Sequence, residues 1–83
     1  MAVQLKLSNL GRVTQAQVQS ALSPLGKVTS VKMSGTTCIV EIEGGVVQKA
    51  VDTISRGEMW LGDLDLIDSS GLGELEKAKI SLA

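Results

Sequence analysis

The sequence lacks most of the residue types on which catalytic and metal sites are built. It has no histidine, no phenylalanine and no tyrosine, and it has one tryptophan and one cysteine. Histidine is the commonest general base and the commonest metal ligand in proteins, so its absence argues against both kinds of site. No serine or cysteine stands in a recognisable arrangement with a base. The sequence therefore favours a protein that is not an enzyme and that uses neither a metal nor a cofactor.

The single cysteine and the short apolar runs bear on where the protein works. Cys38 allows no internal disulfide, which is consistent with a reducing compartment, and its apolar neighbours predict a small buried side chain. No signal peptide is recognisable, and every apolar run is far shorter than the about 20 residues that cross a bilayer. We expect a cytoplasmic protein without a membrane partner.

Neither sign of charge is in clear excess. The net charge of −1 gives no electrostatic reason to expect nucleic acid as the partner. The first 40 residues contain four basic residues and no acidic one, whereas all nine acidic residues follow them. Because folding interleaves these segments, we interpret the charges as ordinary solvated groups. The 83 residues and the globular composition predict one small domain.

Apolar residues at regular spacings predict the first half of the fold. Val3, Leu5 and Leu7 alternate with polar residues, which is typical of a strand with one buried face. Thr14 can cap a helix, and Pro24 ends it. The apolar positions of this helix, spaced to form one stripe, are Val18, Ala21, Leu22 and Leu25.

A hairpin and a second helix follow. Residues 27–33 and 36–43 are predicted strands joined by a tight turn at Ser34-Gly35. In the second of these strands we expect Cys38, Val40 and Ile42 to point inward. A second amphipathic helix is predicted from residue 47 and is closed by Gly57. Its apolar positions are Val47, Ala50, Val51 and Ile54.

The last third of the chain is expected to hold one strand and one helix. Residues 59–67 are predicted to form the fourth strand, with Trp60 pointing inward and Leu61 outward. Residues 74–82 are predicted to form a short terminal helix. We divide the chain into a domain over residues 1–68 and a tail over residues 69–83.

The predicted order β-α-β-β-α-β indicates an α+β fold of the ferredoxin-like plait. Right-handed crossovers place two helices on one face of a four-stranded antiparallel sheet with strand order 4-1-3-2. The other face of the sheet is then free, unless the tail helix covers it, and the sequence leaves both arrangements open. A protein partner or a second copy of the chain is expected to bind this face or an exposed strand edge. The candidate residues on the face are Lys6, Thr37, Ile39, Glu41, Leu61, Asp63, Asp65 and Ile67.

Over residues 5–67 the chain resembles the RNA recognition motif family. The segment LKLSNL from residue 5 looks like the strand-one motif, and VTQAQVQSALSPLGKV from residue 13 is similar to the first helix and the turn after it. The resemblance implies the fold. The family stacks bases on aromatic residues at positions occupied here by Lys6, Thr37 and Ile39, so the usual RNA surface is absent. Nucleic-acid binding remains the alternative, through phosphate contacts from Lys6, Arg12, Lys27 and Lys32.

Two further resemblances bear on metal binding and regulation. The register of residues 21–31 is similar to heavy-metal-associated domains, which bind soft metals with two cysteines in the loop before the first helix. Residues 11–14 occupy that loop and contain no thiol, so we expect no metal. The segment DSSGLG at residues 68–73 resembles anti-sigma-factor antagonists, which implies a phosphorylated serine at Ser69 or Ser70. The alternative is a loop that caps a helix.

Overall fold

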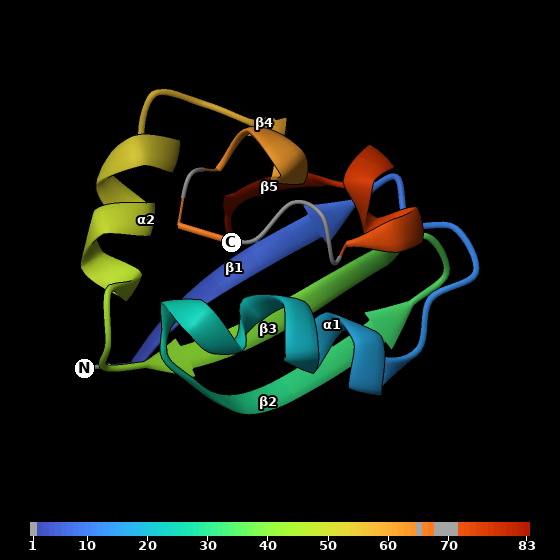
Figure 1. The fold of residues 1–83 in the computed structure, drawn as a ribbon, viewed down its shortest axis with the longest axis horizontal. Coiled ribbons are helices and arrows are strands. Elements are labelled where there is room, and N and C mark those ends of the chain that lie inside the picture. The colour runs from blue at the N-terminus through green and yellow to red at the C-terminus, as the bar shows by residue number, and fades with distance from the viewer. Residues whose placement is uncertain (1, 65, 68–71) are drawn as a thin grey trace.

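The computed structural model describes residues 2–64, 66–67 and 72–83. These residues form a small α+β fold in which two helices accompany an antiparallel sheet of five strands (Figure 1). The order of the strands across the sheet is β2-β3-β1-β5-β4. The helices and strands are β1 (Ala2–Ser8), α1 (Gln15–Leu22), β2 (Lys27–Ser34), β3 (Thr37–Glu43), α2 (Val47–Ile54), β4 (Met59–Trp60) and β5 (Lys79–Leu82). Short 3₁₀ segments are Ser23–Leu25, Leu61–Asp63 and Gly73–Lys77.

The elements expected in the first half of the chain are confirmed. Thr14 caps α1 in a capping box, in which its Oγ1 accepts from the backbone N–H of Gln17 at 3.3 Å. The Gln17 Oε1 in turn accepts from the backbone N–H of Thr14 at 2.8 Å. These bonds satisfy donors that a helix start leaves unpaired. The capping residue was therefore readable from the sequence.

Alternation along the strands gives the sheet a buried face and an outer face. Leu5, Leu7, Val40 and Ile42 point to the buried face and are fully buried. The buried residues of α1 and α2 join the same core, so both helices lie on this side. Burial of this apolar area stabilises the fold by about 25 cal/mol per Å². The inward positions expected for β1 and β3 are confirmed.

Glycine is required where β3 turns into α2. The backbone N–H of Val46 donates to the carbonyl of Leu25 at 2.7 Å, which brings two chain segments very close. Gly45 has φ of +59°, and a Cβ there would lie 2.5 Å from the Leu25 carbonyl oxygen. Both the left-handed backbone and the lack of space exclude a side chain.

The strand expected over residues 59–67 is wrong beyond Trp60. After β4 the segment Leu61–Asp63 is a 3₁₀ turn, the N–H of Leu64 donates to the Leu61 carbonyl, and the N–H of Ile67 donates to the Leu64 carbonyl, both at 3.2 Å. Leu61, Leu64 and Ile67 are all buried. Their spacing of three matches the 3₁₀ repeat of three residues per turn, and it does not match the two-residue repeat of a strand.

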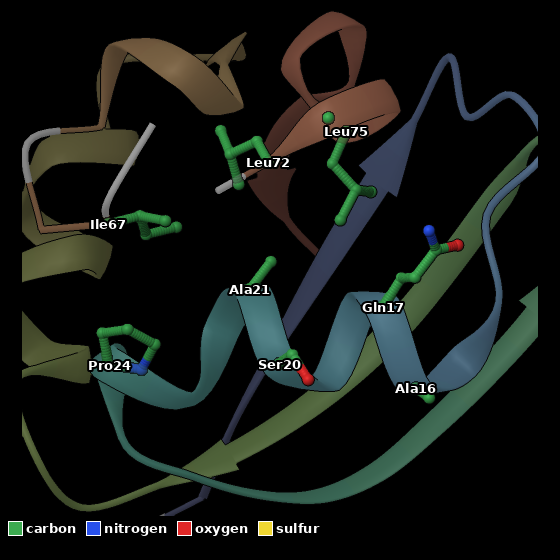
Figure 2. Close-up of a pocket in the computed structure, with 9 residues that line it drawn as sticks. Ala16, Gln17, Ser20, Ala21, Pro24, Ile67, Leu72 and Leu75 are labelled. Carbon is green, nitrogen blue, oxygen red and sulfur yellow. The ribbon is translucent and has the colours of Figure 1, made fainter. Parts of the chain in front are cut away.

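The helix expected over residues 74–82 is also wrong at its end. A 3₁₀ segment covers Gly73–Lys77, and the chain then extends into β5. Leu72 and Leu75 are buried on the helix side of the sheet, where they line one hollow together with Ala21 of α1 (Figure 2). Residues 72–83 therefore leave the outer face of the sheet free.

The strand expected to pair with β1 is replaced by β5. This strand lies between β1 and β4 and is antiparallel to both, so five strands replace the expected four. The expected strand order 4-1-3-2 is therefore wrong, and the observed order, read from the same edge, is β4-β5-β1-β3-β2. The expected boundary between residues 68 and 69 lies outside the described residues.

Replacing Ile80 with alanine tests whether β5 belongs to the core. The Ile80 side chain is 0% exposed. We expect Ile80→Ala to lower the free energy of unfolding by about 2–5 kcal/mol, because it leaves a cavity in a closely packed core. Urea denaturation measures the change.

The matched control is Leu82→Ala in the same strand. Leu82 is 43% exposed, and its truncation should cost less than about 1 kcal/mol. Equally small losses in the two variants would contradict the central position of β5.

Candidate functional site

The outer face of the sheet is where several of the predicted site residues come together. Lys6 lies opposite Ile39, and Lys32 lies opposite Ile39 from the other side. These three side chains form a row across β2, β3 and β1, which we call the Lys-Ile-Lys row. Lys6 and Lys32 are exposed and Ile39 is half-buried. Lys6, Thr37, Ile39 and Glu41 thus share one surface, as the alternation of β1 and β3 predicts.

The site residues predicted on the fourth strand are placed differently. Leu61 is 0% exposed and Ile67 is 7% exposed, so both belong to the core, and their expected position on the open face is wrong. Asp63 is exposed at the end of the 3₁₀ segment Leu61–Asp63. Asp65 and the candidate phosphorylation sites Ser69 and Ser70 lie outside the described residues. Phosphorylation there stays a prediction.

Trp60 and Lys79 are surface residues that the sequence reasoning missed. They lie opposite each other in β4 and β5, and Trp60 is 45% exposed. The Lys79 Nζ lies 4.7 Å from the centroid of the Trp60 ring, a cation–π contact. Trp60 was expected to point inward with Leu64. The sequence signal that could have predicted β5, and with it this surface, is the alternation of the polar residues Lys79 and Ser81 with the apolar residues Ile80 and Leu82.

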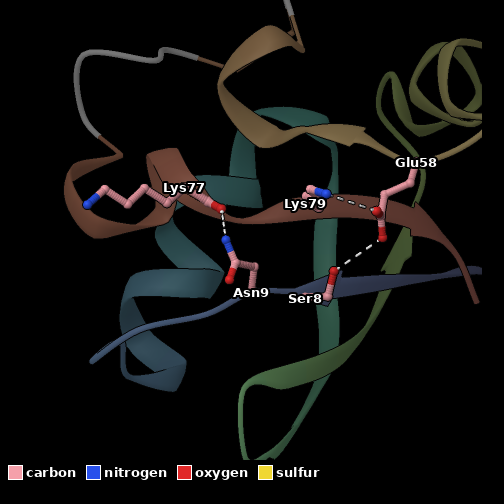
Figure 3. A network of polar contacts seen from close by, with 5 residues as sticks. All are labelled: Ser8, Asn9, Glu58, Lys77 and Lys79. Carbon is pink, nitrogen blue, oxygen red and sulfur yellow. Dashed lines mark hydrogen bonds and ion pairs between the residues drawn. The ribbon is translucent and has the colours of Figure 1, made fainter.

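Polar contacts connect the end of β1 to β5 and to Glu58, the residue before β4 (Figure 3). The Ser8 hydroxyl donates to Glu58 Oε2 at 3.3 Å, and Lys79 Nζ lies 3.6 Å from Glu58 Oε1. The Asn9 Nδ2 donates to the Lys77 carbonyl at 2.9 Å. Because the ion pair is solvent-exposed it contributes at most about 1 kcal/mol. The network orients Lys79 beside Trp60.

The charged residues on the outer face change along the strands. The Lys-Ile-Lys row is basic, whereas Glu41 and Glu43 follow Ile39 along β3 toward the other end of the sheet. Thr29 donates from its hydroxyl to Glu41 Oε1 at 3.1 Å, which holds that carboxylate against β2. The face therefore has a basic band that crosses the strands, with Glu41 beside it, and Glu43 farther along opposite Lys27.

The strand edges are less suited to pairing with another strand. The β2 edge carries a bulge between Val28 and Ser30, and the Gln15 Nε2 donates to the Val31 carbonyl at 3.0 Å. Bulges, lysines and occupied backbone groups all oppose edge-to-edge pairing. At the opposite edge, β4 has two residues and so offers little backbone for pairing with another strand. Of the two predicted surfaces, the sheet face is the better supported.

A hollow of about 490 Å³ lies between α1 and the segment around Leu72 (Figure 2). Its described lining carries no ionisable side chain, so it offers no group for acid–base chemistry. The lining residues are Ala16, Gln17, Ser20, Ala21, Pro24, Ile67, Leu72, Gly73 and Leu75. Within residues 2–64, 66–67 and 72–83, no group of three or more acidic or cysteine side chains is placed to hold a metal ion. Across the same residues, none of the helices has the length and apolar character required to span a membrane.

Cys38 is the nucleophilic side chain of the core. It is buried on the inner face of β3, opposite Leu7 and Met33. Burial raises the pKa of its thiol, because the low-dielectric core disfavours the thiolate, and a hydrogen bond from the backbone of Lys32 opposes this in part. The thiol is therefore protonated and unreactive at neutral pH.

The raised pKa of Cys38 predicts a loss of stability in alkaline solution. The folded chain retains the thiol proton above the ordinary thiol pKa of 9.0, whereas the unfolded chain releases it. The stabilising contribution is thus complete below that pKa and decreases as the pH rises through it. Urea denaturation from about pH 8 to about pH 10 should show this decrease, and Cys38→Val should lack it. The same pH dependence in the wild type and in Cys38→Val would contradict the attribution of this loss of stability to the Cys38 thiol.

Comparison with known proteins does not extend these observations. No protein-family model matches the chain, and no curated protein matches it either.

Proposed function

We propose that the chain is a ferredoxin-like plait in which β5 takes the place of the fourth strand, and that it is a non-enzymatic module that binds a protein partner. The binding surface is the outer sheet face, and the Lys-Ile-Lys row is the observation that carries the proposal. Within the described residues, no helix covers this face. A half-buried apolar side chain between two lysines offers contact area together with orientation.

The sheet face supports this proposal better than the alternatives do. Pairing through β2 would have to displace the Gln15 contact and accommodate the bulge. A second copy of the chain docked face to face with the two Lys-Ile-Lys rows superposed would bring four lysines together, which like-charge repulsion opposes. A different protein is therefore the favoured partner.

Substituting Ile39→Glu tests the proposed surface. The new carboxylate lies in register between Lys6 and Lys32, and opposite-charge pairs across strands stabilise a sheet. The free energy of unfolding should therefore change by less than about 1 kcal/mol. Binding of the partner should weaken by about tenfold or more, because the central apolar contact is lost. The measurement compares partner retention from a host extract on immobilised wild-type and variant chains.

The matched control is Thr53→Glu, which adds the same charge on the exposed side of α2. It should retain the partner as the wild type does. Retention that survives Ile39→Glu would exclude the outer face as the binding surface. Sedimentation of the purified chain separately reports self-association.

Nucleic-acid binding is a second candidate, favoured by one observation. Trp60 lies on the outer face beside Lys79, which places an aromatic ring and a cation together at the edge of the sheet. Such a pair can stack a base and contact a phosphate. The sequence resemblance to RNA recognition motifs bears on the fold only, because the stacking positions of that family hold Lys6, Thr37 and Ile39 here.

Titration with mixed single-stranded RNA at low salt tests this second candidate. If it holds, Trp60→Leu should weaken binding about 5- to 150-fold, because stacking contributes about 1–3 kcal/mol per base. The control Lys49→Gln removes a positive charge from α2 and should change binding by less than about twofold. Even non-specific complexes with nucleic acid form in the micromolar range of protein concentration. The absence of binding at about 50 µM protein would therefore exclude nucleic acid as the partner.

A further inference from the structure

We infer that the partner presents an extended acidic segment that crosses the strands of the outer face along the Lys-Ile-Lys row. This inference rests on the proposed function and specifies the chemistry of the partner. Two exposed lysines with one half-buried apolar side chain between them are complementary to a segment that carries two acidic residues around an apolar one. The acidic residues on the same face limit the direction in which such a segment can lie.

The two lysines are available for an external anion. Among the described residues the structure contains one ion pair, between Lys79 and Glu58, so Lys6 and Lys32 have no carboxylate within 4.0 Å there. Lys6 lies opposite Ser81 on its other side, and Lys32 is on the edge strand β2. Bringing carboxylates to both lysines would therefore break no described internal pair.

The spacing of the row limits the form of the segment. Adjacent strands lie about 4.8 Å apart, so the backbones at Lys6 and Lys32 are separated by about 10 Å with Ile39 midway. In an extended peptide, side chains four residues apart share one side and are separated by about 13 Å. Flexible lysine side chains readily cover the difference. An acidic residue, an apolar residue two positions later and a second acidic residue two positions after that match the row.

The direction of the segment follows from Glu41 and Glu43. A peptide laid along β3 would bring an acidic side chain next to Glu41, two residues from Ile39. A peptide that crosses the strands instead meets Lys32, Ile39 and Lys6 in turn and avoids both carboxylates. Like-charge repulsion thus selects the crossing direction.

The same features favour a peptide over a nucleic acid. Ile39 occupies the centre of the row, where an apolar side chain of a peptide gains contact area but a sugar-phosphate backbone does not. Glu41 borders the row and repels phosphates. Trp60 lies at the far edge of the sheet, so it cannot stack a base over the centre.

The first experiment uses a fluorescent peptide of sequence Thr-Glu-Thr-Val-Thr-Glu-Thr with capped ends, titrated with the full chain at low salt. We expect saturable binding that Lys6→Gln and Lys32→Gln each weaken about two- to fivefold, as the loss of one exposed ion pair predicts. In the double variant, peptide binding should weaken about 4- to 25-fold, the product of the two single effects. Lys49→Gln on α2 is the matched control and should bind like the wild type. A peptide with glutamine in place of both glutamates loses the same two ion pairs and should also bind about 4- to 25-fold more weakly.

The second experiment separates a failure of this inference from a failure of the proposed function. It repeats the partner retention with the double lysine variant beside Ile39→Glu. Loss of the partner in both variants supports the inference. Loss in Ile39→Glu with retention in the double lysine variant overturns the acidic segment and leaves the proposed surface intact. Retention in both overturns both proposals.

Two further results would overturn the inference. One is the absence of saturation with the peptide at about 1 mM protein, a level at which even weak complexes are seen. The other is tighter binding of mixed single-stranded RNA than of the peptide together with a loss on Trp60→Leu, which identifies nucleic acid as the occupant.

Discussion

The pairing of β1 with β5 is the interaction on which the rest of the structure depends. β1 lies at the centre of the sheet, and β5 supplies the backbone partners on the edge that β3 does not use. The same pairing places Ile80 in the core and gives β4 a strand to join. Without it, β1 would have an unpaired edge, Leu5 and Leu7 would lose neighbours, and Trp60 would have no position on the outer face.

Most of the fold up to residue 57 could be predicted from the sequence, because each element there carries a complete local signal. Thr14 and Gln17 form a capping box, and the alternation of β1 and β3 separates inward from outward residues. The last third was misread because its apolar residues recur every third position. Leu61, Leu64 and Ile67 follow this spacing, and so do Leu72, Leu75 and Ala78. A repeat of three is uncommon in long runs and resembles fragments of both a strand and a helix.

The candidate site was predictable to the same extent. Lys6, Thr37, Ile39 and Glu41 were placed correctly on the outer face because their strands are long enough to fix which side is buried. Trp60 and Leu61 were assigned to opposite sides from those observed. The assignment assumed a strand that continued to residue 67, and one change of parity exchanges the two faces. β4 ends at Trp60, whose partner Lys79 is the first residue of β5, and the only local signal for this end is the three-residue spacing of Leu61 and Leu64 that follows.

The register of the sheet also constrains how the chain reaches its final form. Lys6 and Ser81 are direct neighbours across two strands, yet they stand near opposite ends of the 83-residue sequence. The hairpin of β2 and β3 can assemble early from residues close in sequence, whereas this last pairing must first close a loop that spans almost the whole chain. Such distant pairings slow folding, so the sheet is expected to close in one late, cooperative step.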